Sequence, residues 1–259
     1  IKKRPTSECE RCKKAWMVSG KTGAVPDETV GHIQSVQCVS QEEVVTAAQN
    51  RCWREIMGGI TKYGSAKRSI EILERDKEQT LKTLWREEKL DEFFPKQELV
   101  EEMHKLHEEH REAKQKVRED SDMGDAGETA EEEKEFSEEE AIWARKLDGA
   151  AIDKEKKILY VLEFKRTTDQ REEYEAGARV RAEKQDEDVV EGLVRVGRKQ
   201  EQGWTAKQIT VVGGTCGSVN VTSFEENLKE LQVLESKWGK MRADLARKLL
   251  EEQDTVFRR

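Results

Sequence analysis

The sequence lacks any apolar run that approaches the roughly 18 residues of a membrane-spanning helix, so we expect no membrane-spanning helix within these residues. No signal peptide is visible, and because the chain begins at Ile1 we expect its natural N-terminus to lie upstream. The 5 cysteines are an odd number and are unevenly spread, a pattern that suits a reducing compartment better than a disulfide framework. We therefore expect an intracellular protein.

Charge is abundant and unevenly distributed. Charged residues make up 39% of the chain and hydrophobic residues 35%, so part of the chain is expected to lie outside any core. Residues 61–140 carry 15 basic and 26 acidic groups, whereas residues 1–60 and 141–259 are slightly basic. The net charge of -8 thus arises in the middle of the chain and does not exclude a nucleic-acid partner for either end.

Composition and periodicity divide the chain into four segments. They are a loop-rich segment with a following helix (1–60), a charged helical spacer (61–119), an acidic flexible linker (120–136) and a mixed α/β domain (137–259). The first helix is expected to run from Gln41 to the pair Gly58-Gly59. The spacer is expected to be helical from about Ile70 and to break at Pro95.

The second half of the spacer has a short heptad pattern. Its seam positions are Leu99, Met103, Leu106, His110, Ala113 and Val117. The pattern covers fewer than three heptads, and it makes the helix over 99–117 a candidate for self-association.

The last segment combines helices and strands. The predicted elements are a helix capped by Ser137 and Glu140, strands at 146–153 and 158–166, a helix at 169–199, a strand at 207–214, and a helical end capped by Ser223 and Glu226. Capping boxes and alternating apolar residues are the signals for these elements. The order predicts a mixed α/β domain.

The strand at 158–166 is strongly apolar, yet it carries Glu163 and Lys165 on one face. A turn at 154–157 makes a hairpin in which Asp153 faces Ile158, and counting back places Asp148 opposite Glu163. Opposed side chains have Cβ atoms about 5 Å apart, so the two carboxylates repel unless a cation lies between them. Asp153 would lie on the order of 16 Å along the strand from Glu163, too far to share that ion.

A hard ion such as Mg²⁺ fits this pair, because it prefers oxygen ligands and often uses one or two carboxylates with water and a phosphate. Lys165 can hold a nucleophilic water or neutralise a phosphate, which completes the parts of metal-assisted phosphodiester hydrolysis. The alternative is an ordinary Glu163–Lys165 pair on a half-exposed edge strand, with Asp148 at the start of a strand.

The stretch LDGAAIDKEKKILYVLEFK resembles the core of the PD-(D/E)XK nuclease superfamily, and the resemblance covers roughly residues 137–235. It implies an α-β-β-β-α-β scaffold and an endonuclease that depends on Mg²⁺ or Mn²⁺. Leu147 stands where the motif usually has proline. The residues at its metal-binding and catalytic positions are Asp148, Glu163 and Lys165, and the backbone carbonyl of Phe164 is expected to add a ligand.

The N-terminal segment contains a CCHC set of Cys9, Cys12, His32 and Cys38. Thiolates with one imidazole in a tetrahedral shell are typical of structural Zn²⁺. The alternative is four unrelated residues in a loop. Cys52 and Cys216 lie apart from this set, and we expect both to be structural.

The stretch DETVGHIQSVQC resembles the CCHC zinc knuckle that follows the reverse transcriptase of non-LTR retrotransposons, where a restriction-like endonuclease of the PD-(D/E)XK class comes next. The shared order implies a fragment from the C-terminal end of a retroelement polyprotein. Such a protein would act on DNA in the nucleus and could also bind the element RNA. No reverse-transcriptase motif is present in the sequence.

Several other residues are candidates for binding DNA, a metal or phosphate, but each also has a structural explanation. Arg179, Arg181 and Lys184 follow the catalytic strand and could bind DNA phosphates, or they could form a plain exposed helix face. His104, His107 and His110 could bind a metal, but we expect a solvated face. GGTCGS at 213–218 lacks the ending of a phosphate-binding loop, so a turn is expected. Trp204 and Trp238 are expected to belong to the core.

Two functions therefore remain open. The first is a metal-dependent DNA endonuclease. The second is a non-enzymatic, zinc-binding coiled-coil interaction protein whose nuclease-like domain is inactive. The geometry at Asp148 and Glu163 distinguishes them.

Overall fold

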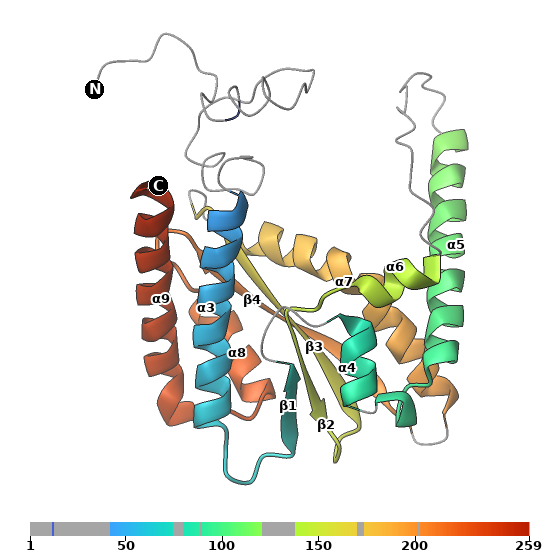
Figure 1. Ribbon diagram of the computed structural model, residues 1–259, viewed down its shortest axis with the longest axis horizontal. Helices are drawn as coiled ribbons and strands as arrows, with labels where there is room; N and C mark the ends of the chain where they lie inside the picture. Colours follow the sequence, from blue (N-terminus) through green and yellow to red (C-terminus); the bar gives the residue numbers. More distant parts are fainter. Residues whose placement is uncertain are drawn as a thin grey trace. The chain divides into compact units, whose positions relative to one another are not determined.

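The structure is a computed structural model that describes Cys12 and residues 42–74, 80–88, 90–120, 138–169, 174–200 and 203–258 (Figure 1). The chain divides into two compact units. The first comprises Ile1–Ala66, Phe164–Arg179 and Val211–Arg259, and the second comprises Lys67–Glu163 and Val180–Thr210.

The described strands form one four-stranded sheet with the order β1-β2-β3-β4. They are β1 (Ile70–Glu74), β2 (Gly149–Asp153), β3 (Ile158–Thr167) and β4 (Thr205–Gly214). The pairs β1–β2 and β2–β3 are antiparallel, and the sheet as a whole is mixed. The mixed α/β class predicted from the sequence is therefore confirmed.

The β2–β3 hairpin has the predicted register. Asp153 faces Ile158, and the ladder ends at the pair Gly149 and Leu162. The buried carboxylate of Asp153 closes the turn, because its Oδ1 accepts hydrogen bonds from the backbone N–H groups of Glu155 (3.1 Å) and Lys156 (3.0 Å). Local side-chain to backbone bonds of this kind are what favours aspartate in turns.

The helix predicted through Ile70 is wrong, because residues 70–74 form strand β1. Ile70 faces Asp153 and Ile72 faces Ala151. The apolar pair Ile70 and Ile72 is buried and alternates with exposed Glu71, which is the pattern of a strand with one covered face. Pairing with a distant strand outweighs the helix-like spacing within the segment.

The core of the second unit joins the sheet to helices. They are α4 (Leu81–Glu87), η1 (Leu90–Glu92), α5 (Lys96–Asp120), α6 (Glu138–Ala144) and the greater part of α7 (Tyr174–Lys199). Trp204 packs at 4.5 Å from Phe93, measured between ring centroids. Leu99, Met103 and Leu106 of the predicted heptad seam are buried in this unit, so the first half of that seam is not available to a second copy.

In the first unit, α3 (Glu42–Tyr63) lies beside α9 (Glu235–Arg258) (Figure 1). The two run antiparallel, since Arg51 binds Glu252 and the N–H of Leu234 donates to the carbonyl of Tyr63. The prediction that α3 ends at Gly58-Gly59 is therefore wrong, because packing against α9 carries the helix on to Tyr63.

The third helix of this unit is α8 (Val221–Glu230). Its N-cap is Asn220, whose side chain accepts from the N–H of Ser223. The capping box predicted at Ser223 and Glu226 is thus displaced by three residues. An asparagine oxygen satisfies the free N–H groups of a first helical turn as well as a serine does.

Candidate functional site

The carboxylate pair lies at the end of an apolar face of the hairpin. Ala150 pairs with Val161 and Ile152 pairs with Leu159, and all four side chains belong to the core of the second unit. Alternation along each strand puts the next residue of that face at Asp148 on one side and Glu163 on the other. These two flank the last ladder pair, Gly149 and Leu162. Glu163 is only 2% exposed, whereas Asp148 is partly exposed in a bend before β2.

Phe164 and Lys165 belong to the first unit. The Phe164 ring stacks on Trp53 of α3 with 6.2 Å between ring centroids, and alternation turns Lys165 to the other face of β3. Lys165 thus shares a strand face with Glu163, two residues earlier. The carbonyl of Phe164, expected to be a metal ligand, accepts a hydrogen bond from Gln49 Nε2 at 2.9 Å. That bond uses one of the two lone pairs of the oxygen.

Within the described part of the chain, no group of three or more His, Cys, Asp or Glu side chains is arranged to hold an ion. An ion at Asp148 and Glu163 would therefore complete its shell with backbone carbonyls, water and phosphate, which Mg²⁺ commonly does. Of the predicted zinc ligands, Cys12 is buried, whereas Cys9, His32 and Cys38 lie outside the described residues, as does the predicted linker from residue 121 onward.

The remaining cysteines sit in different environments. Cys52 is buried in α3, and burial raises the pKa of its thiol to about 11. Cys216 is exposed in the GGTCGS segment. That segment is a turn, as expected, closed by a bond from Gly214 N–H to the Ser218 carbonyl. Asp169 supports the turn by accepting from the backbone N–H of Cys216 at 3.0 Å.

The three predicted DNA-binding residues of α7 have different surroundings. Arg179 forms an ion pair with Glu175 at 3.1 Å in the first unit. Arg181 and Lys184 are exposed in the second unit. Lys184 also lines a shallow hollow of about 690 Å³ along α7, beside Val190. Arg181 and Lys184 therefore remain accessible to a phosphate, while Arg179 already has a carboxylate.

The histidines of α5 do not gather around one point. His107 Nε2 lies 2.9 Å from Asp188 Oδ2, and Arg145 binds the other oxygen of Asp188 at 2.6 Å. Burial alone would raise the pKa of Asp188, but the hydrogen bonds from Arg145 and His107 hold it below its ordinary value. This polar cluster links α5, α7 and the residue that follows α6, and it has a structural explanation.

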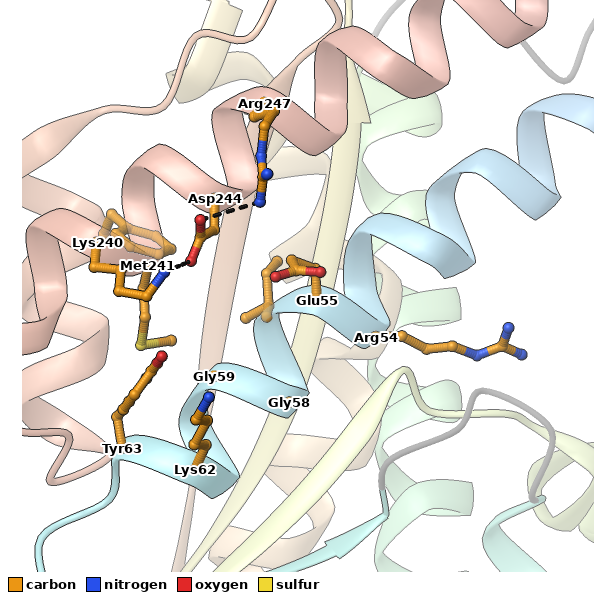
Figure 2. Close-up of a pocket in the computed structure, with 12 residues that line it drawn as sticks. Arg54, Glu55, Gly58, Gly59, Lys62, Tyr63, Lys240, Met241, Asp244 and Arg247 are labelled. Atoms are coloured by element: carbon orange, nitrogen blue, oxygen red, sulfur yellow. Dashed lines mark hydrogen bonds and ion pairs between the residues drawn. The ribbon is translucent and has the colours of Figure 1, made fainter.

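A basic hollow in the first unit was not anticipated from the sequence. It has a volume of about 410 Å³ and lies among α3, α8 and α9 (Figure 2). Its charged lining consists of Arg54, Glu55, Lys62, Lys240, Asp244 and Arg247. The signal in the sequence was the pair Gly58-Gly59 inside an otherwise helical stretch.

Comparisons with known proteins identify no relative. No family model matches the chain, and neither does any curated protein or solved structure. The helices that the structure describes include none with the length and apolar character needed to cross a membrane.

Proposed function

We propose that this chain is a metal-dependent DNA endonuclease that hydrolyses phosphodiester bonds and nicks target DNA for a retroelement. One observation carries the proposal. Asp148 and Glu163 flank the last ladder pair of the hairpin and continue the face on which Val161 is buried. Directly opposed side chains on paired strands lie about 5 Å apart at Cβ, and a cation between two carboxylates at that spacing would offset their repulsion.

The topology supports the same class of nuclease. The described elements include α3, β1, β2, β3, α7 and β4 in chain order, the α-β-β-β-α-β order that the resemblance implies, with α4, η1, α5 and α6 inserted between β1 and β2. The carboxylates then fall one residue before β2, at Asp148, and within β3, at Glu163. A buried acid on a central strand is costly unless it is paired or hydrogen-bonded, and a divalent ion at buried Glu163 would contribute to that compensation.

In the proposed mechanism, Asp148 and Glu163 would hold Mg²⁺ or Mn²⁺ through their carboxylate oxygens, and the Phe164 carbonyl would be a further ligand. The bound ion would polarise the phosphate and lower the pKa of a bound water. Lys165 orients the attacking water and neutralises charge that develops on the phosphate oxygens. Water adds to phosphorus as the bond to one sugar oxygen breaks.

The other predicted parts have supporting roles. Cys9, Cys12, His32 and Cys38 would hold one structural Zn²⁺, and exposed Arg181 and Lys184, with Arg179, would contact DNA phosphates. The setting is nuclear, in a larger retroelement polyprotein that also handles element RNA. Elemental analysis should find about one zinc per chain, since closed CCHC sites hold their ion tightly. Protein free of zinc would remove the knuckle from the proposal.

Nicking of a supercoiled plasmid with and without divalent ions tests the catalytic proposal. Asp148→Ala and Glu163→Ala should abolish nicking and weaken metal binding measured by calorimetry, because each removes a ligand. Lys165→Ala should leave metal binding nearly intact and lower the rate by about 10²- to 10⁴-fold. Glu155→Ala, which removes an exposed acid from the same hairpin, is the matched control and should nick normally.

Two results would contradict the mechanism. One is nicking by the wild-type protein in EDTA, and the other is full activity of Glu163→Ala. Either would reject Asp148 and Glu163 as the site of a required ion, whereas no nicking with any divalent ion would leave the chain as an interaction protein with an inactive nuclease-like domain.

A further inference from the structure

We infer that the first unit has a second nucleic-acid-binding site, a groove between α3 and α9 that holds the phosphate backbone of a nucleic-acid strand. We call it the α3–α9 groove and define it by Gly58, Lys62, Lys237, Lys240 and Arg247. It goes beyond the proposed hydrolysis and uses neither Asp148 nor Glu163.

Two glycines open the groove. A Cβ on Gly59 would lie 2.6 Å from the terminal methyl group of Met241, so Gly59 leaves room for that side chain of α9. A Cβ on Gly58 would have no atom within 4 Å, so packing does not explain that glycine. Glycine in a helix interior is unfavourable relative to alanine, and its usual benefit is a backbone that a neighbour or ligand can approach closely. The hollow beside Gly58 is the space such a ligand would fill.

The groove has more cations than carboxylates to balance them. Lys62 and Lys237 both lie over the Tyr63 ring, with their Nζ atoms 5.2 and 5.8 Å from its centroid. In the described parts of the chain, neither ammonium group has an ion-pair partner. This local surplus is notable in a chain whose net charge is -8.

The one acidic residue of α9 in this groove is shared. Lys240 Nζ lies 2.8 Å and Arg247 Nη2 lies 3.2 Å from the carboxylate of Asp244, as Figure 2 shows. The two cations therefore divide a single negative charge between them. A phosphate placed in the groove would meet two unbalanced ammonium groups and two half-balanced cations, with Glu55 of α3 as the other acid of the lining.

The length of the row favours a strand over a free nucleotide. Lys237, Lys240 and Arg247 are offset by three and seven residues, so they lie on one face of α9, and at 1.5 Å per residue they span about 15 Å. A mononucleotide concentrates its charge at one point. A strand of nucleic acid advances about 3.4 Å per phosphate along a duplex, so a 15 Å row can follow several successive phosphates.

The experiment measures binding of a fluorescein-labelled 20-nucleotide DNA strand by anisotropy, in EDTA so that no cleavage interferes. Lys62→Gln/Lys237→Gln removes the two unbalanced charges. This double variant should weaken binding by roughly tenfold or more at 0.05 M NaCl. The plot of log K against log salt should also become less steep by about 1.4, because each lost phosphate contact removes about 0.7 from its slope. Lys82→Gln/Arg86→Gln removes two exposed charges from α4 of the second unit and is the matched control, expected to change affinity less than twofold.

A second variant tests the groove without changing its charge. Gly58→Gln fills the hollow with a good helix former, so it should weaken DNA binding while the urea midpoint stays at or above that of the wild type. AMP as competitor should not displace the strand at equal phosphate concentration.

The results distinguish failure of the groove inference from failure of the proposed hydrolysis. Wild-type affinity in the Lys62→Gln/Lys237→Gln protein, an equal loss in the α4 control, or displacement by AMP would each overturn the inference. Failure of plasmid nicking with the expected binding losses would instead reject the proposed hydrolysis and leave the groove in place.

Discussion

Two aspartates of one hairpin should respond to mutation in opposite ways. Asp153 is fully buried, and its Oδ1 accepts from two backbone N–H groups of the turn. Hydrogen bonds to a charged group contribute about 1.5–3 kcal/mol each, but water can reach the turn amides after truncation. We therefore expect Asp153→Ala to lower the free energy of unfolding by about 2–3 kcal/mol, while folded protein still nicks DNA.

Asp148 should show the reverse. Asp148→Ala is expected to abolish nicking because a metal ligand is lost. In EDTA its midpoint should equal or exceed that of the wild type, since repulsion from Glu163 is relieved.

Urea unfolding followed by tryptophan fluorescence, beside thermal melts, measures the stability side. A loss of 2–3 kcal/mol corresponds to a midpoint lower by about 5–10 °C in a chain of this size. Asp153→Asn keeps an oxygen at Oδ1 and is the matched control, so most of the stability should return. An Asp153→Ala protein that melts like the wild type yet cannot nick would refute the assignment of the two roles.

Three further predictions concern stability. Glu252→Gln should cost about 2–4 kcal/mol in urea unfolding, because buried Glu252 binds Arg51 at 2.6 Å and Lys248 at 2.9 Å. Burial alone would raise the pKa of Glu252, but those hydrogen bonds lower it, as Arg145 and His107 do for Asp188. A carboxyl group whose pKa is lower in the folded state stabilises the fold above its unfolded pKa, which is near 4, and this stability is lost as the pH falls through the folded pKa. The urea midpoint should therefore drop between about pH 5 and pH 2. A midpoint that does not change over this range would contradict the prediction. Gly58→Ala should raise stability by about 0.5–1 kcal/mol, and any decrease would show that the open space at Gly58 is misplaced.

The sequence predicted best where the signal was local. The β2–β3 hairpin came out in its correct register, because a four-residue turn fixes the pairing of both strands. Strand β1 was missed, since Ile70 and Leu73 have helical spacing and only pairing with β2 makes a strand of them. The α3–α9 groove was missed for the same reason, a contact between distant segments, because Gly58 lines a hollow only when α9 packs beside α3.

The separation of β1 from β2 sets an order of events during synthesis. The β2–β3 hairpin forms across a turn of four residues, whereas the partner of β1 is synthesised about 80 residues after β1. At translation speeds of 5–20 residues per second, this interval is roughly 4–16 s. During that time Ile70 and Ile72 are exposed on a nascent chain. Glu71, between them, places a charge within the short apolar segment, the kind of residue that discourages wrong strand pairing before the right partner emerges.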